Sequence, residues 1–214
     1  MNLVFLGPAG SGKGTQAKKL EADFGVVQIS TGDLLREAVR SGTELGQKAD
    51  PLMKQGKLVP DDLVIGIIEE RFRAGGLGNG FLLDGFPRTL PQALALDAML
   101  ERNGMKIDRV LSLEVPEELL YERITGRRSC PKCGTVYHVV TAPPQRPGIC
   151  DVEGEALIQR SDDSPEKLKN RLEVFRTEIP QVKEHYARKG LLAEIHGVGT
   201  PEGIYTEIRK ALGR

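Results

Sequence analysis

The sequence has no tryptophan, only three cysteines and no excess of either charge. Lysine plus arginine and aspartate plus glutamate number 30 each, so no global basic field exists to recruit nucleic acid. No apolar run approaches the roughly 20 residues of a membrane-spanning helix. Internal repeats and low-complexity tracts are also missing. What remains is an ordinary globular chain of 214 residues, long enough for one core with small insertions.

The three cysteines all lie between Cys130 and Cys150. An odd, clustered set argues against a disulfide framework and for a reducing compartment. The chain also opens directly on a predicted strand, where a signal peptide would carry a longer apolar segment. We therefore expect a cytoplasmic protein. No large unexplained apolar face is visible, which favours a monomer.

A glycine-rich loop near the start organises the chain. The apolar run 3–6 precedes it and a helical pattern over about 13–23 follows it, and between them Gly7, Gly12 and Lys13 have the spacing G-x-x-x-x-G-K. Glycines let successive backbone N–H groups point into one concavity, and the helix N-terminus adds partial positive charge. The sequence therefore predicts a phosphate-binding loop. Gly14 stands where Ser or Thr usually follows the lysine, with Thr15 one place later.

Apolar segments alternate with helical patterns along the rest of the chain. Strands are expected near 26–29, 81–84, 109–115 and 191–195, with helices between them. This alternation predicts an α/β fold: a parallel sheet of about five strands with helices on both faces and ligands at the carboxyl ends of the strands.

Three local features refine this outline. Ser30 to Asp33 supply N-cap residues for a helix over 34–40, and Asp61 is expected to cap the next long helix. Asp84 ends an apolar strand, where a carboxylate near a phosphate loop is placed to hold Mg²⁺ through water. The stretch 127–163 holds all three cysteines with several prolines and glycines, and it predicts a small β-rich insertion.

Five motifs in order resemble the adenylate kinases, and the match runs along essentially the whole chain. They are Gly7-x-x-Gly10-x-Gly12-Lys13-Gly14-Thr15, Ser30-Thr31-Gly32-Asp33-Leu34-x-Arg36, Asp84-Gly85-Phe86-Pro87-Arg88-x-x-x-Gln92, Gly126-Arg127-Arg128 and Arg160-x-Asp162-Asp163. The third motif is specific for nucleoside monophosphate kinases. The resemblance is to the long-lid bacterial type with a cysteine-bearing lid.

This resemblance implies reversible transfer of the terminal phosphoryl group of Mg-ATP to AMP. It implies a P-loop core over 1–29, 60–126 and 164–214, a monophosphate-binding segment over 30–59 and a lid over 127–163. Always-charged arginines suit such a reaction because they neutralise several phosphates and can grip their oxygens in pairs. The implied catalytic residues are Lys13, Arg88, Arg123, Arg127, Arg160 and Arg171.

The resemblance also implies the nucleotide contacts. Those of ATP are Gly10, Ser11, Gly12, Lys13, Gly14, Thr15, Arg127, Val136, Tyr137 and Gly199. Those of AMP are Thr31, Arg36, Lys57, Leu58, Val59, Gly85, Arg88, Gln92, Arg160 and Arg171. Gln92 is chemically fit to read an adenine edge because its amide both donates and accepts. Asp162 and Asp163 resemble lid-closure residues, and His138 is expected to be structural.

A structural zinc site is expected at Cys130, Cys133, Cys150 and Glu153, with the spacing C-x2-C-x16-C-x2-E. Three thiolates at this spacing form a strong soft-ligand set. In the resembling lids the fourth ligand is usually cysteine or aspartate, and glutamate has one methylene more than aspartate. The alternative is a vestigial site held by packing and hydrogen bonds.

Other functions fit the residues less well. A kinase for another nucleoside monophosphate is disfavoured by Gln92 and the long lid. A regulatory P-loop NTPase would carry a guanine-binding Asn-Lys-x-Asp motif or a second acid after Asp84, and the sequence has neither. A nucleic-acid-binding zinc ribbon would need a basic face, but acidic residues balance the basic ones over 127–163.

Overall fold

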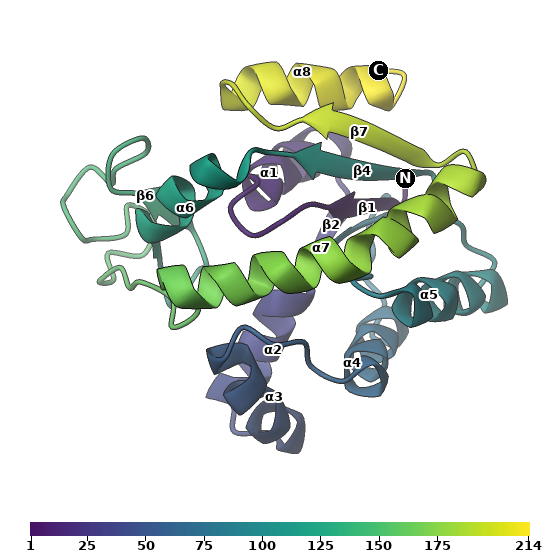
Figure 1. Ribbon diagram of the computed structural model, residues 1–214, viewed down its shortest axis with the longest axis horizontal. Helices are drawn as coiled ribbons and strands as arrows, with labels where there is room; N and C mark the ends of the chain where they lie inside the picture. Colours follow the sequence, from purple (N-terminus) through teal and green to yellow (C-terminus); the bar gives the residue numbers. More distant parts are fainter.

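The computed structural model describes residues 1–214, and its centre is a five-stranded parallel sheet with the strand order β2-β3-β1-β4-β7 (Figure 1). The strands of this sheet are β1 Leu3–Leu6, β2 Val27–Ser30, β3 Phe81–Asp84, β4 Arg109–Glu114 and β7 Leu192–His196. The expected α/β class and parallel sheet are confirmed.

Alternate residues of β1 face two separate apolar clusters. Val4 and Leu6 belong to the larger one, with side chains of α4 (Asp61–Arg73), α5 (Leu90–Arg102) and α7 (Pro165–Arg188). Leu3 and Phe5 belong to the other, with side chains of α1 (Lys13–Phe24) and α8 (Pro201–Ala211). The expected helices on both faces are therefore present. The helices are α1 Lys13–Phe24, α2 Thr31–Arg40, α3 Glu44–Lys54, α4 Asp61–Arg73, α5 Leu90–Arg102, α6 Glu117–Thr125, α7 Pro165–Arg188 and α8 Pro201–Ala211.

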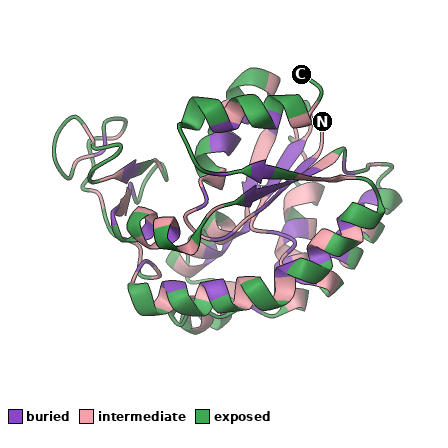
Figure 2. Cartoon of the chain, turned by 45° about the horizontal axis from the view of Figure 1, so that its top comes forward, coloured by how far each residue is buried: buried purple, intermediate pink, exposed green.

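Buried residues gather on the sheet and on the inner sides of the helices, while the outer helix faces are exposed (Figure 2). Two segments extend from the sheet, and the first of them, α2 and α3, still contributes Leu35 and Ala49 to the larger apolar cluster. α2 and α3 pack on each other, and residues 127–163 form a small unit around β5 Arg127–Ser129 and β6 Val136–His138 (Figure 1). β5 and β6 are antiparallel, and isolated bridges such as Ser129 with Ile158 extend the pairing, as expected for a β-rich insertion.

Two helix starts differ from expectation. Helix α2 begins at Thr31 because the Ser30 side chain accepts a hydrogen bond from the N–H of Asp33 and so acts as the N-cap. Asp61 is the first residue of α4 instead of its cap, which is Pro60. The Asp61 carboxylate points to other partners, described below. No helix in the structure has the length and apolar character to cross a membrane.

Candidate active site

The glycine-rich loop connects β1 to the N-terminus of α1 at the carboxyl edge of the sheet. Gly7, Gly10 and Gly12 all have positive φ, at 145°, 84° and 96°, a region that L side chains rarely adopt. A Cβ on Gly10 would also lie 3.2 Å from the Leu120 carbonyl oxygen. The loop shape therefore depends on glycine at these positions.

Lys13 occupies the centre of this loop. Its Nζ donates to the carbonyl oxygens of Gly7 at 2.7 Å and Pro8 at 2.9 Å. Burial lowers the pKa of Lys13 to about 8; the Asp84 carboxylate offsets part of this effect and the Arg88 guanidinium adds to it. The loop thus holds an ammonium group that is short of negative partners, as expected of a site that receives phosphates.

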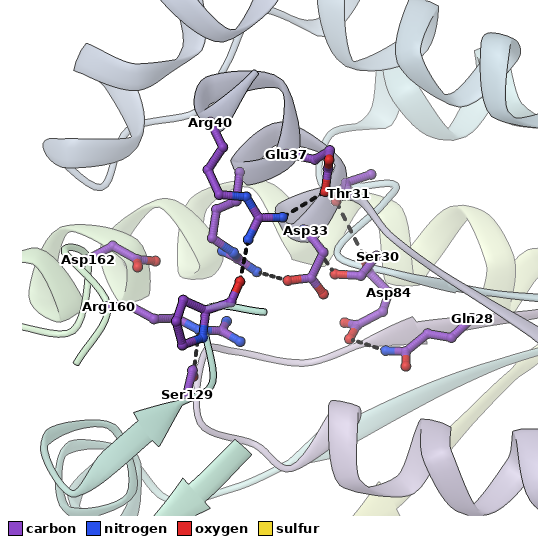
Figure 3. A network of polar contacts seen from close by, with 12 residues as sticks. Gln28, Ser30, Thr31, Asp33, Glu37, Arg40, Asp84, Ser129, Arg160 and Asp162 are labelled. Carbon is purple, nitrogen blue, oxygen red and sulfur yellow. Dashed lines mark hydrogen bonds and ion pairs between the residues drawn. The ribbon is translucent and has the colours of Figure 1, made fainter. Parts of the chain in front are cut away.

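The other acidic and polar groups at this edge are held by the neighbouring strands. Asp84 ends β3, and one of its carboxylate oxygens accepts from Gln28 Nε2 at 3.2 Å. The Thr31 hydroxyl donates to the carbonyl oxygen of Gly85 at 2.9 Å. In Figure 3, Thr31 and Asp33 lie in α2, Asp84 and Gln28 lie beside Ser30, and Arg160 lies with Ser129 across from α2.

Several arginines converge on the same region, and each has a partner. Arg127 makes a two-pronged contact with the fully buried Asp163, and Arg171 Nη1 lies 2.7 Å from Asp162. Arg160 Nε donates to the Ser129 hydroxyl at 2.9 Å. The carboxylates thus hold the arginines in place without neutralising all of them.

Arg88 lies among these charges with only a neutral acceptor. Its Nε donates to the Gly85 carbonyl oxygen at 2.8 Å. Burial and the neighbouring Arg171 guanidinium lower the pKa of Arg88 to about 10, so it stays charged at neutral pH. Arg123, from α6, reaches the carbonyl oxygens of Gly10 and Gly197 at 3.4 and 3.2 Å.

A pocket opens between α2, α3 and the segment after β3. Nine of the ten residues expected to contact AMP line it, the exception being Arg160, which lies outside on the larger cleft. The nine are Thr31, Arg36, Lys57, Leu58, Val59, Gly85, Arg88, Gln92 and Arg171. The pocket also has an apolar wall, supplied by Leu35, Met53 and Val64, that the sequence motifs did not predict. Apolar residues of this kind carry no sequence signal that separates a ligand-facing wall from an ordinary buried face.

A cleft of about 1480 Å³ runs from the glycine-rich loop to the cysteine-bearing segment. Its lining includes Asp84, Arg123, Arg160 and every residue expected to contact ATP: Gly10, Ser11, Gly12, Lys13, Gly14, Thr15, Arg127, Val136, Tyr137 and Gly199. Arg36, Arg88 and Arg171 line both the pocket and the cleft. The two spaces therefore meet at a group of guanidinium groups.

Two segments face each other across this cleft and touch. Arg40 of α2 donates to the carbonyl oxygen of Pro131 at 2.7 Å, and Glu37 braces the same guanidinium at 2.6 Å (Figure 3). Backbone groups hold the ring of His138. Its Nδ1 accepts from the backbone N–H groups of Val140 and Thr141, and its Nε2 lies 3.3 Å from the Glu122 carbonyl oxygen. These contacts support the expectation that His138 is structural.

The cysteines lie away from the glycine-rich loop, within two similar turns. The Sγ atoms of Cys130, Cys133 and Cys150 all lie within 4.8 Å of one another. In the first turn the N–H of Gly134 bonds the Cys130 carbonyl oxygen, and in the second the N–H of Gly154 bonds that of Cys150. Both glycines have φ near 70°, so the sequences C-x-x-C-G and C-x-x-E-G fold alike.

Glu153 therefore occupies, in the second turn, the position of Cys133 in the first. Its carboxylate lies 2.6 Å from Lys132 Nζ and does not join the cysteine cluster. Burial raises the pKa of Cys150, but hydrogen bonds from the backbone N–H of Glu153 and from the Tyr137 hydroxyl outweigh this effect and lower it to about 7. A thiolate is the form that binds a soft metal.

Comparison with known proteins agrees with this geometry. The family model described as adenylate kinase matches residues 5–191. Proteins named adenylate kinase are 49% identical in Anaeromyxobacter dehalogenans, over the whole length of both chains, and 50% identical in Carboxydothermus hydrogenoformans, over 99% of each chain. A third, from Archaeoglobus fulgidus, is 50% identical over 99% of this chain and 98% of its own. The chain belongs to the adenylate kinase family, the ATP:AMP phosphotransferases.

Proposed function

We propose that the large cleft holds Mg-ATP, that the smaller pocket holds AMP, and that the phosphoryl group passes between them beside Arg36, Arg88 and Arg171. The observation that carries this proposal is that these three arginines line both spaces. Phosphoryl transfer is catalysed mainly by positioning and by neutralising the phosphate charge. A site shared by two nucleotides needs its fixed cations at the junction.

Lys13 and the loop N–H groups would bind the outer phosphates of ATP, while Arg123, Arg127 and Arg160 would close over the triphosphate. Asp84 would hold Mg²⁺ through water, since its carboxylate ends β3 next to the loop. Bound Mg²⁺ neutralises part of the charge on the phosphates. Arg36 and Arg171 would grip the AMP phosphate, and Gln92 would face the base.

We further propose that residues 30–59 and 127–163 move as two lobes on a core made of 1–29, 60–126 and 164–214. The two lobes would exclude water from the cleft, because water would otherwise accept the phosphoryl group. The contact of Arg40 with Pro131 supports this division, since it joins the two lobes across the cleft.

We also propose a structural zinc at the cysteine cluster, a monomeric state and a cytoplasmic location.

A substrate panel tests the function. The purified chain with Mg-ATP and AMP is expected to produce two ADP per turnover, and UMP, CMP and GMP are expected to react far more slowly. The product is measured by a coupled assay in each direction. If a folded sample makes no ADP from ATP and AMP, or prefers another monophosphate, the proposal is wrong.

The pKa of Lys13 predicts a proton linkage. With a pKa of about 8, Lys13 is half protonated at pH 8 in the free site, whereas bound phosphates hold it fully protonated. Binding of Mg-ATP is therefore expected to take up about half a proton at pH 8 and about a tenth at pH 7. Its affinity should fall as the pH rises above 8.

Calorimetric titration in two buffers of different ionisation enthalpy measures this uptake. Lys13→Met is the control: it binds Mg-ATP more weakly and should show no buffer dependence. Identical binding heats in the two buffers at pH 8 would contradict the linkage for the parent chain.

The shared junction also predicts simultaneous occupancy. Two adenosines joined by five phosphates would span both spaces and should protect residues 30–59 and 127–163 from trypsin together. ATP alone should protect 30–59 less, because it leaves the smaller pocket empty. Cleavage sites are read by mass spectrometry. Protection of neither segment by the joined nucleotide would count against two closing lobes.

A further inference from the structure

We infer that Asp61 is a positioning residue that fixes the side-chain amide of Gln92 in the orientation that accepts adenine and rejects a base with a 6-oxo group. This inference rests on the proposed function, in which the pocket holds AMP. It assigns a role in base selection to a carboxylate that does not itself line the pocket.

The Gln92 amide has two fixed neighbours. Its Oε1 accepts from the backbone N–H of Arg88 at 2.8 Å, and its Nε2 donates to Asp61 Oδ1 at 2.7 Å. A backbone N–H can only donate and an ionised carboxylate can only accept. Only one of the two amide orientations satisfies both neighbours, so the hydrogen-bond network itself assigns the amide.

Reversing the amide would be costly. The oxygen would then face the Asp61 carboxylate and the NH₂ group would face the N–H of Arg88, so both hydrogen bonds would become repulsive contacts. Gln92 is 1% exposed, which leaves little water to compensate. The other Asp61 oxygen accepts from the Thr89 hydroxyl at 2.9 Å, so the carboxylate is held as well.

The orientation matters because purine edges differ in polarity. Each Gln92 group keeps one free site: one N–H on Nε2 and one lone pair on Oε1. Adenine offers a donor at its 6-amino group and an acceptor at N1, whereas hypoxanthine and guanine offer an acceptor at O6 and a donor at N1. A freely rotating amide could pair with either edge, but an amide fixed in one orientation can match only one of them.

The arrangement spans the junction of α4 and α5, which pack side by side (Figure 1). Asp61 is the first residue of α4, and Gln92 lies in the first turn of α5. A purely structural role would make Asp61 a clamp between the two helices. Such a clamp would affect stability without changing the choice of base.

Asp62 provides the matched control. It also lies in the first turn of α4, so both acids favour the helix N-terminus, but Asp62 is exposed and has no side-chain partner in the structure. Asp61→Asn and Asp62→Asn each replace a carboxylate by an amide of the same shape. Only an asparagine at position 61 can turn its NH₂ group toward Gln92, which removes one of the two repulsive contacts of the reversed amide; the contact with the Arg88 N–H remains.

The experiment measures kcat/KM for AMP and for IMP, with Mg-ATP in excess. IMP is the sharpest probe because it differs from AMP only at position 6 and at the N1 proton. Asp61→Asn should lower the AMP-to-IMP ratio of kcat/KM about tenfold, mainly through KM, and Asp62→Asn should leave it unchanged. Asp61→Ala should shift the ratio in the same direction.

A double-mutant cycle tests the route through Gln92. In a Gln92→Ala background, Asp61→Asn should no longer change the ratio. An unchanged ratio in Asp61→Asn, or an equal change with and without Gln92, would overturn the inference. The turnover of ATP with AMP by the parent chain is measured separately, so failure of this inference is distinguishable from failure of the proposed function.

Discussion

Arg88→Ala is expected to lower kcat by about three orders of magnitude without lowering the melting temperature. An arginine that stabilises a transferring phosphoryl group contributes roughly 10³- to 10⁵-fold to kcat. Arg88 is placed for this role because it lines both the pocket and the cleft. Its only side-chain hydrogen bond in the structure is to the Gly85 carbonyl oxygen, so the folded protein loses little when the side chain is removed.

The charges around Arg88 also indicate that Arg88→Ala will not lower the melting temperature. Arg171 and Arg36 are like-charged neighbours that lower the pKa of Arg88. These guanidinium groups repel one another in the free site, and bound phosphates would offset that repulsion. Removing one of these cations should therefore leave the melting temperature unchanged or slightly raised. Arg88→Ala should therefore lower kcat without lowering the melting temperature.

Two further variants serve as controls for this prediction. Arg88→Lys keeps a charge but loses the planar fork, so its kcat should lie between those of the parent and the alanine variant. Arg128→Ala removes an arginine that lines neither space and bonds only the carbonyl oxygens of Thr125 and Arg127, so it should retain near-parent kcat. A kcat for Arg88→Ala within tenfold of the parent would rule out the proposed role.

Features set by neighbours in the sequence were predictable from the sequence. The glycine-rich loop needs strand, glycines, lysine and helix in immediate succession, and all four are found as expected. The parallel sheet follows from alternating strands and helices, because a crossover returns each strand in the same direction. The arginines and loop residues of both nucleotide spaces were placed by motifs that resemble the family.

Features that depend on distant contacts were not predictable in this way. Asp61 was expected to cap α4, and nothing near it in the chain shows that its carboxylate meets Gln92, 31 positions away. Asp163 resembled a lid residue, but its buried contact with Arg127 appears only once residues 127–163 have folded. Spacing brings side chains to the same region, whereas packing decides which of them touch.

Glu153 shows the same limit of prediction from sequence spacing, here at the cysteine cluster. Its position in the turn matches that of Cys133, as the spacing predicted, yet its carboxylate pairs with Lys132. Sequence spacing describes the backbone turn well, since the two glycine-ended turns are alike. It does not show which of two competing cations, a lysine or a metal ion, the longer glutamate side chain prefers.

Removal of zinc is expected to lower the melting temperature by about 10 °C and to expose residues 127–163 to proteases. Three thiol groups within 4.8 Å fit a tetrahedral site, and a carboxylate oxygen can supply the fourth ligand. Structural zinc contributes on the order of 10 kcal/mol to a small module. Only part of that reaches global unfolding, because the segment can open locally, and at 2–4 °C per kcal/mol roughly 3 kcal/mol corresponds to this shift.

The loss of folded structure on zinc removal should be confined to the cysteine-bearing segment, residues 127–163. Its own apolar cluster holds only Cys130, Tyr137, Cys150 and the partly buried Leu157, so little else maintains it. The glycine-rich loop follows β1, and its Ala9 packs against a separate apolar cluster, so the loop shares no side chain with the cysteine-bearing cluster. Protein treated with a zinc-selective chelator should therefore still bind Mg-ATP while its turnover falls. Melting curves and limited proteolysis, with and without added zinc, measure the two effects.

Variants at the fourth position decide whether Glu153 is a ligand. Glu153→Cys should bind zinc more tightly, because a second C-x-x-C turn completes a four-thiolate set. Lys132→Ala should also tighten binding, since it removes the cation that holds the carboxylate at 2.6 Å. Glu153→Gln should weaken binding. If metal analysis of protein purified without chelator finds no zinc, and added zinc leaves the melting temperature unchanged, the three cysteines hold no metal and the segment depends on its hydrogen-bonded turns alone.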